Sequence, residues 1–149
     1  MASTQITISI DMDGTIADLY SNPNWLEQLR AYDPTPYLTA KPLVRMNVLA
    51  RRLNSLQKRG YRIAIVSWLS KVSTKEYDEA VTTAKREWLT RHLPSVSWDE
   101  IVIVPYGTPK ENYCHGEKDI LFDDEERNRM NWTGMAFDAV DILSVLTQL

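Results

Sequence analysis

The apolar and polar residues of the chain follow two spacings, one typical of buried strands and one typical of amphipathic helices. Residues 5 to 10 form an apolar, partly β-branched run, which predicts a buried strand in the first part of the chain. Further short apolar runs predict four more strands, at residues 61 to 66, 101 to 104, 119 to 122 and about 134 to 137.

Helical spacing occupies the stretches between these strands. Residues 43 to 59 carry one apolar stripe and are followed by Gly60, a residue suited to a helix C-terminus. The tetrapeptide Ser73-Thr74-Lys75-Glu76 is a capping box that predicts the start of a second helix, which Pro94 ends. A last short helix is expected near residues 139 to 147.

Strands that alternate with helices, each strand a nearly continuous apolar run, indicate a parallel sheet covered on both faces. The predicted fold class is therefore α/β, a three-layer Rossmann-like parallel sheet. Residues 1 to 149 are expected to form one domain, because no repeat or low-complexity linker divides them.

Residues 16 to 42 interrupt the alternation with a polar, aromatic segment. Ser21-Asn22-Pro23 predicts a short helix with Pro23 at its first position, and the later prolines at 34, 36 and 42 predict loop. We expect this segment to be a small insertion that covers the site, although a long surface connection would have the same composition.

The composition limits the class of protein. With 149 residues, of which 44% are hydrophobic and 25% charged, the chain can form a globular domain with a core. The net charge of -3 argues against a nucleic acid or an anionic membrane surface as the main partner. Cys114 is the single cysteine, which excludes an internal disulfide and fits a reducing cytoplasm. No membrane span or signal peptide is recognised, so we expect a cytoplasmic protein, whose oligomeric state stays open.

In sheets of this kind, ligands bind beyond the carboxyl ends of the strands. The first strand is followed by Asp11-Met12-Asp13-Gly14-Thr15, which carries two carboxylates on a glycine turn. One aspartate oxygen of this pair and a nearby main-chain carbonyl would give Mg²⁺ the hard ligands that it prefers. Five residues alone could also arise by chance or form a loop calcium site.

Three further polar groups lie near the ends of later strands. Ser67 follows the second strand, Lys110 lies on the loop before the fourth, and Asp123-Asp124 follow the fourth. Each has an ordinary explanation when taken singly: a serine that caps a turn, a solvated loop lysine, and the acidic first turn of a helix. Their combination and order favour one shared site. Lys118 competes with Lys110, but it lies near the start of its strand, far from the carboxyl end.

The acid pair at Asp11 and Asp13, followed in order by Ser67, Lys110 and Asp123-Asp124, resembles the four-part signature of the haloacid dehalogenase (HAD) superfamily. The resemblance implies a HAD-like fold with a very small cap insertion after the first strand. Receiver domains use similar residues around Mg²⁺, but their paired acids follow the first strand and their lysine comes last. The order therefore argues against a receiver.

The resemblance also implies a role for each residue. Asp11 would be the nucleophile that forms an aspartyl-phosphate, and Asp13 would protonate the leaving oxygen and then activate water. Ser67 would donate a hydroxyl and Lys110 a positive charge to the phosphoryl oxygens, because phosphoryl transfer depends on positioning and charge neutralisation.

Mg²⁺ is the cofactor that the resemblance implies. Asp11 and the main-chain carbonyl of Asp13 would contribute ligands from the first strand, and the second acid pair would complete the site. Within that pair we favour Asp124 as the direct ligand, with Asp123 beside it. Hard oxygen ligands of this kind suit Mg²⁺ and leave positions for water and phosphate.

Within the superfamily the chain is most similar to the 5′(3′)-deoxyribonucleotidases and their bacterial and phage relatives. The similar stretches are residues 11 to 18, Lys41-Pro42, Lys85-Arg86-Glu87-Trp88-Leu89, and residues 119 to 124 with 134 to 139. Two departures affect the substrate pocket. The cap is short, and Trp68 stands where the family often has a small polar residue.

The leading hypothesis is a Mg²⁺-dependent phosphomonoesterase that acts as a 5′-nucleotidase on deoxynucleoside or nucleoside monophosphates. Candidates to stack on a base or sugar are Tyr20, Trp25, Tyr37 and Trp68, although aromatic residues at such spacings also serve as core. The alternatives are a phosphatase for another small metabolite or for a nucleic-acid terminal phosphate, and a non-catalytic domain that binds phosphate or a partner. A mutase would use the same residues, but a thin cap offers little to hold a leaving sugar.

Overall fold

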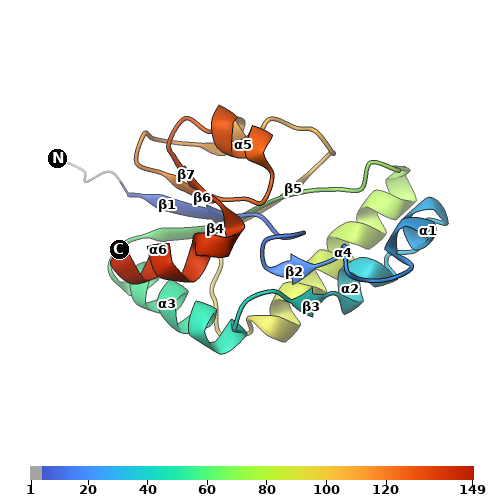
Figure 1. Cartoon of the computed structure of the whole chain (residues 1–149), viewed down its shortest axis with the longest axis horizontal. Helices are drawn as coiled ribbons and strands as arrows, with labels where there is room; N and C mark the ends of the chain where they lie inside the picture. The colour runs from blue at the N-terminus through green and yellow to red at the C-terminus, as the bar shows by residue number, and fades with distance from the viewer. Residues whose placement is uncertain (1–4) are drawn as a thin grey trace.

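The computed structural model describes residues 5–149 and contains a five-stranded parallel sheet (Figure 1). The strands are β1 (Thr7–Ile10), β4 (Arg62–Trp68), β5 (Glu100–Val104), β6 (Ile120–Phe122) and β7 (Met135–Phe137). Their spatial order is β5-β4-β1-β6-β7, and every adjacent pair runs parallel. The predicted α/β class and parallel sheet are therefore confirmed.

Helices lie on both sides of this sheet (Figure 1). On one face pack α3 (Met46–Lys58), the later part of α4 (Lys75–His92) and α6 (Ile142–Gln148). On the other face lies α5 (Glu126–Asn131), in contact with the short 3₁₀ helix η1 (Lys110–Tyr113). The main core joins buried residues of the sheet and helices, among them Ile8, Ile10, Ile63, Ile65, Leu49, Leu53 and Trp88.

The helix ends agree with the sequence patterns to within three residues. Gly60 follows α3 with a φ of +103°, which confirms the predicted C-terminal glycine. The N-cap of α4 is Thr74, whose side chain accepts the N–H of Tyr77 at 3.1 Å. The capping residue is therefore one position later than Ser73, which the capping box had indicated. At the end of the chain, a 3₁₀ turn, η2 (Ala139–Asp141), leads into α6.

The segment between β1 and α3 is more regular than its prolines predicted. It holds an antiparallel pair of two-residue strands, β2 (Ala17–Asp18) and β3 (Lys41–Pro42), and two short helices, α1 (Trp25–Arg30) and α2 (Thr35–Thr39). The expectation of loop after Pro34 was wrong, because Pro36 lies in the first turn of α2, where no N–H is needed for the helix. Pro23 is not the first helical residue either, since α1 begins at Trp25.

Across residues 5–149, none of the helices is both long enough and apolar enough to cross a membrane.

Candidate active site

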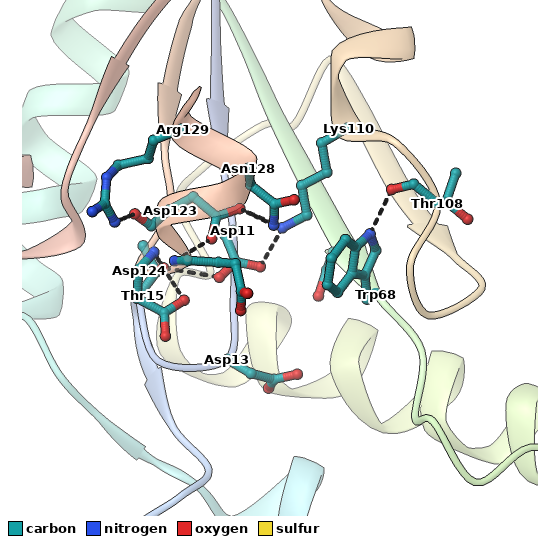
Figure 2. Close-up of polar contacts among 12 residues, drawn as sticks. Asp11, Asp13, Thr15, Trp68, Thr108, Lys110, Asp123, Asp124, Asn128 and Arg129 are labelled. Atoms are coloured by element: carbon teal, nitrogen blue, oxygen red, sulfur yellow. Dashed lines mark hydrogen bonds and ion pairs between the residues drawn. The ribbon is translucent and has the colours of Figure 1, made fainter. Parts of the chain in front are cut away.

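The carboxyl ends of β1, β4 and β6 meet at one edge of the sheet, and the residues singled out from the sequence gather there (Figure 2). Asp11 follows β1 directly, and its N–H donates to the carbonyl of Phe122 at 3.0 Å. One carboxylate oxygen of Asp11 accepts from Lys110 Nζ at 2.8 Å, and the other accepts from the Thr15 hydroxyl at 2.9 Å. The Asp11 carboxylate is thus held by donors on both of its oxygens.

A tight turn brings Thr15 back to Asp11. The carbonyl of Met12 accepts three N–H groups, those of Thr15, Ile16 and Ala17, each at 3.0 Å. Gly14 has a φ of +81°, a conformation that residues with a Cβ rarely adopt. The glycine turn expected after the first strand is therefore present, and the Thr15 hydroxyl also accepts the N–H of Asp124 at 3.2 Å.

The two acids after β6 have different surroundings. Asp123 is buried and accepts from Lys110 Nζ at 2.6 Å, from the Asn128 amide at 3.1 Å and from the N–H of Glu125 at 2.9 Å. Asp124 is more exposed, and among the described residues its carboxylate accepts only a long contact of 3.5 Å, from Thr15. Asp124 therefore keeps more acceptor capacity for a ligand than Asp123 does.

Three carboxylates are close enough to share a cation. Oxygens of Asp11, Asp123 and Asp124 lie within 4.8 Å of one another. Burial and the charge of Asp11 raise the pKa of Asp124 to about 8, and the same two causes raise the pKa of Asp123 to about 6. The raised pKa values show that the three carboxylates repel one another when all are ionised. A divalent cation such as Mg²⁺, which prefers hard oxygen ligands, would neutralise this charge. The donor set therefore fits the predicted cofactor.

We expect Gly14→Ala to weaken binding of Mg²⁺. A Cβ at this position would clash with Oδ2 of Asp124, so that carboxylate would have to move. Displacing one ligand should reduce the affinity for Mg²⁺ about 10-fold or more. Isothermal titration calorimetry with Mg²⁺ measures the change.

The control for this substitution is Gly60→Ala. Gly60 also has a positive φ, but its added Cβ would meet nothing within 4 Å. The two variants should lose similar stability through backbone strain, and only the Gly14 variant should lose affinity for the metal. Equal affinity in both variants would contradict a metal site that includes Asp124.

Lys110 links the two acid groups of the site. It is the first residue of η1 and is 2% exposed, and its Nζ contacts both Asp11 and Asp123. Burial lowers the pKa of Lys110, but the two carboxylates outweigh it and leave the pKa above its usual value. Lys118, the competing lysine, lies on the surface. The structure therefore places Lys110, and not Lys118, beside Asp11 and Asp123.

Asp13 points to a different partner, Lys85 of α4. Lys85 Nζ donates to Oδ2 of Asp13 at 2.9 Å, to the hydroxyl oxygen of Ser67 at 2.7 Å and to the carbonyl of Trp68 at 2.7 Å. Burial raises the pKa of Asp13, and Lys85 partly opposes that effect. Ser67 is at the end of β4 and fully buried, so the structure brings it to Lys85; its predicted contact with phosphate stays a prediction.

A cavity of about 450 Å³ opens beside these groups. Asp11, Asp13, Lys110 and Asp124 form its polar end, and the aromatic residues proposed from the sequence line its sides: Tyr20, Trp25, Tyr37 and Trp68. Three of these four, Tyr20, Trp25 and Tyr37, come from the segment between β1 and α3, which therefore forms one wall of the cavity. Trp68 lies beside Lys110, with Lys110 Nζ at 5.3 Å from the ring centre, and its indole N–H donates to the carbonyl of Thr108 at 2.8 Å (Figure 2).

Sequence reasoning assigned no role in the site to Lys85, Tyr106 or Asn128. Lys85 lies four residues after Val81 and three before Trp88, which are both on the apolar stripe of α4, so a lysine within that stripe was a usable signal. Tyr106 lines the cavity and packs on Trp68 with the ring centres 5.0 Å apart. It lies just after the apolar run at 101 to 104, but one aromatic residue on a loop carries little information by itself.

Comparisons with known proteins bear on the fold. No protein-family model and no curated protein matched the chain. Among solved structures, the D,D-heptose 1,7-bisphosphate phosphatase from Burkholderia thailandensis is similar, with a TM-score of 0.53 and 14% sequence identity. The match covers 87% of this chain and 75% of that chain. It shows that the chain has a HAD-like α/β fold, as the order of the polar residues had implied.

Proposed function

We propose that this protein is a Mg²⁺-dependent phosphomonoesterase that forms an aspartyl-phosphate on Asp11. The observation that carries the proposal is the fixed Asp11 carboxylate, which lies between Lys110 and Asp124 at the polar end of an open cavity. A nucleophile held by donors on both oxygens needs little reorganisation before attack. That the similar fold belongs to a phosphatase supports the same class of reaction.

The residues around Asp11 match the needs of phosphoryl transfer. Asp11 attacks phosphorus, and Lys110 neutralises charge on the transferred oxygens. Asp13, whose pKa is raised by burial, protonates the leaving oxygen and then takes a proton from the attacking water. Asp11 and Asp124, with the main-chain carbonyl of Asp13, would hold Mg²⁺, which supplies a positive charge against the phosphoryl group. Asp123 keeps Lys110 in place.

The aromatic cavity walls favour a nucleotide as the substrate. Tyr20, Trp25 and Trp68 lie around the cavity and are not fully buried, so each has ring surface available for a ligand. Planar side chains of this kind stack well on a base. We therefore propose deoxynucleoside or nucleoside 5′-monophosphates as the preferred substrates.

A second candidate is a sugar phosphate. The similar phosphatase is named for a heptose bisphosphate, and two exposed cationic residues, Arg30 and Lys71, also line the cavity of this chain. Neither cation forms an ion pair within the described residues. A substrate with a second phosphate would give them a partner.

A panel of phosphate esters tests both candidates. Phosphate release is measured from 5′- and 3′-deoxynucleotides, ribonucleotides, and sugar mono- and bisphosphates, first with Mg²⁺ and then with EDTA. We expect release that depends on Mg²⁺, with the highest kcat/KM on a 5′-monophosphate, because the reacting phosphate binds at the acidic end and the base along the aromatic walls.

Preference for a sugar bisphosphate would replace the nucleotide proposal and keep the phosphatase. Release that persists unchanged in EDTA would contradict the metal-dependent mechanism. The absence of release from every ester, by a folded protein that binds Mg²⁺, would contradict a phosphatase for small substrates.

A further inference from the structure

The ammonium group of Lys85 lies inside the protein, between three different parts of the chain. Lys85 is 1% exposed, and its Nζ donates to the side chain of Asp13, the hydroxyl of Ser67 and the carbonyl of Trp68. The ring of Tyr37 covers it from the insertion segment, with Nζ 5.1 Å from the ring centre. A lysine so enclosed is costly to bury unless every proton finds an acceptor.

The number of partners matches the chemistry of the group. An ammonium has three N–H donors and no acceptor, and all three donors of Lys85 have a partner within 2.9 Å. Lys85 therefore has no N–H left for a substrate. Because the Ser67 oxygen accepts from Lys85, the proton of the Ser67 hydroxyl must be donated in another direction.

The helix that carries Lys85 is itself fixed at several points. Thr74 caps its first turn, and the indole N–H of Trp88 donates to the carbonyl of Ala40 at 2.7 Å, near the end of the insertion segment. Tyr77 donates its hydroxyl to the carbonyl of Asp33 at 3.0 Å. The contacts of Thr74 and Tyr77 before Lys85, and of Trp88 after it, therefore fix the part of α4 from which Lys85 Nζ reaches Asp13.

We propose that Lys85 is a positioning residue, which holds the Asp13 carboxyl in the orientation that protonates the leaving group. This inference rests on the proposed function and adds a residue to it. Asp13 lies in a glycine turn and has no other side-chain donor within the described residues, so Lys85 decides where its carboxyl group points. The contact is with Oδ2 of Asp13, so it does not involve the main-chain carbonyl expected to bind the metal.

The test uses two substrates that differ in their need for an acid. A nucleoside 5′-phosphate leaves as an alkoxide and needs a proton, whereas the phenolate of p-nitrophenyl phosphate leaves without one. In Lys85→Met we expect kcat/KM for the nucleoside phosphate to fall about 100-fold, and kcat/KM for p-nitrophenyl phosphate to stay within about threefold. The quantity kcat/KM is chosen because it reports the transfer to Asp11 and not the later hydrolysis.

Two controls separate positioning from other effects. Lys75→Met makes the same change on the exposed first residue of α4, and it should leave both kcat/KM values unchanged. Calorimetric titration with Mg²⁺ should give the same affinity for Lys85→Met as for the wild type, because Lys85 contacts neither Asp11 nor Asp124. Should the Met variant not fold, Lys85→Gln gives a polar, uncharged replacement whose nitrogen lies one atom short of the Nζ position that contacts Asp13. It is expected to give the same contrast between the two substrates.

The outcomes distinguish this inference from the proposed function. Equal losses on both substrates, or no loss on either, in a variant that binds Mg²⁺ normally would overturn the positioning role and leave the phosphatase proposal intact. A weaker affinity for Mg²⁺ in Lys85→Met would also overturn it. Failure of the wild type to hydrolyse any phosphate ester, the sugar phosphates included, would overturn both proposals together.

Discussion

Asp11→Asn is expected to abolish phosphate release, with a loss of at least about 10⁴-fold in kcat, because an amide cannot form the aspartyl-phosphate. The substitution should not unfold the protein. The charge of Asp11 is one of the causes that raise the pKa values of Asp123 and Asp124, so its removal relieves repulsion among the buried carboxylates. Without metal at neutral pH, we expect the variant to unfold at the same temperature as the wild type or higher.

The matched comparison is Asp13→Asn, which keeps the nucleophile and removes the acid and base. After incubation with a good substrate, intact-mass measurement should find one added phosphoryl group on the Asp13 variant, because hydrolysis of the intermediate is slowed. The Asp11 variant should carry none. A phosphoryl group on the Asp11 variant, or retained turnover, would show that another residue is the nucleophile.

The sheet could be predicted from the sequence because its strands are nearly continuous apolar runs. Strands of this kind are buried on both faces, and every residue of β1 and β6 is indeed buried. The insertion segment could not be predicted in the same way. Its strands have two residues each, and its helices have six and five, which is too short for periodicity to be detected.

The short elements of the insertion are stabilised by contacts that are distant in sequence. Tyr37 and Leu29 share a small core with Tyr77 and Val81 of α4, which the local sequence cannot reveal. The prolines of this segment suggested loop, but tertiary packing and the tolerance of a first helical turn for proline decided otherwise.

The order of polar residues after the strands indicated six side chains for one shared site: Asp11, Asp13, Ser67, Lys110, Asp123 and Asp124. The fold brings Asp11, Lys110, Asp123 and Asp124 together, as the strand-end rule predicts. Lys85 was missed because that rule considers only strand ends and the adjoining loops. It lies in the middle of a helix, where a lysine is normally solvated, and only its position among apolar neighbours distinguishes it.

Lys110→Met is expected to have the second largest effect, on activity and stability together. Removing the cation from the phosphoryl site should lower kcat about 10²- to 10³-fold. It also leaves the carboxylates of Asp11 and Asp123 without the ammonium group that they share. Removing one partner of a buried ion pair lowers the free energy of unfolding by about 3–5 kcal/mol. For a chain of this size, that corresponds to a fall of roughly 10 °C in Tm.

The destabilisation of Lys110→Met should depend on pH in a definite direction. In the wild type, the pKa of Lys110 is raised above its ordinary value of 10.5. The stability that its ion pairs contribute is therefore fully present below pH 10.5 and is lost only as the pH rises through the raised pKa. In the variant, Asp123 loses the ammonium that lowers its pKa, so this pKa should rise above about 6. Above pH 3.8 the folded state then binds more protons than the unfolded state, and the stability of the variant falls as the pH rises. The difference in Tm between variant and wild type, measured in EDTA, should therefore be small near pH 4 and grow toward pH 8.

Lys118→Met removes an exposed lysine from the same region and should show neither effect. A pH-independent difference would mean that Lys110 acts through packing and not through the charges of the two aspartates.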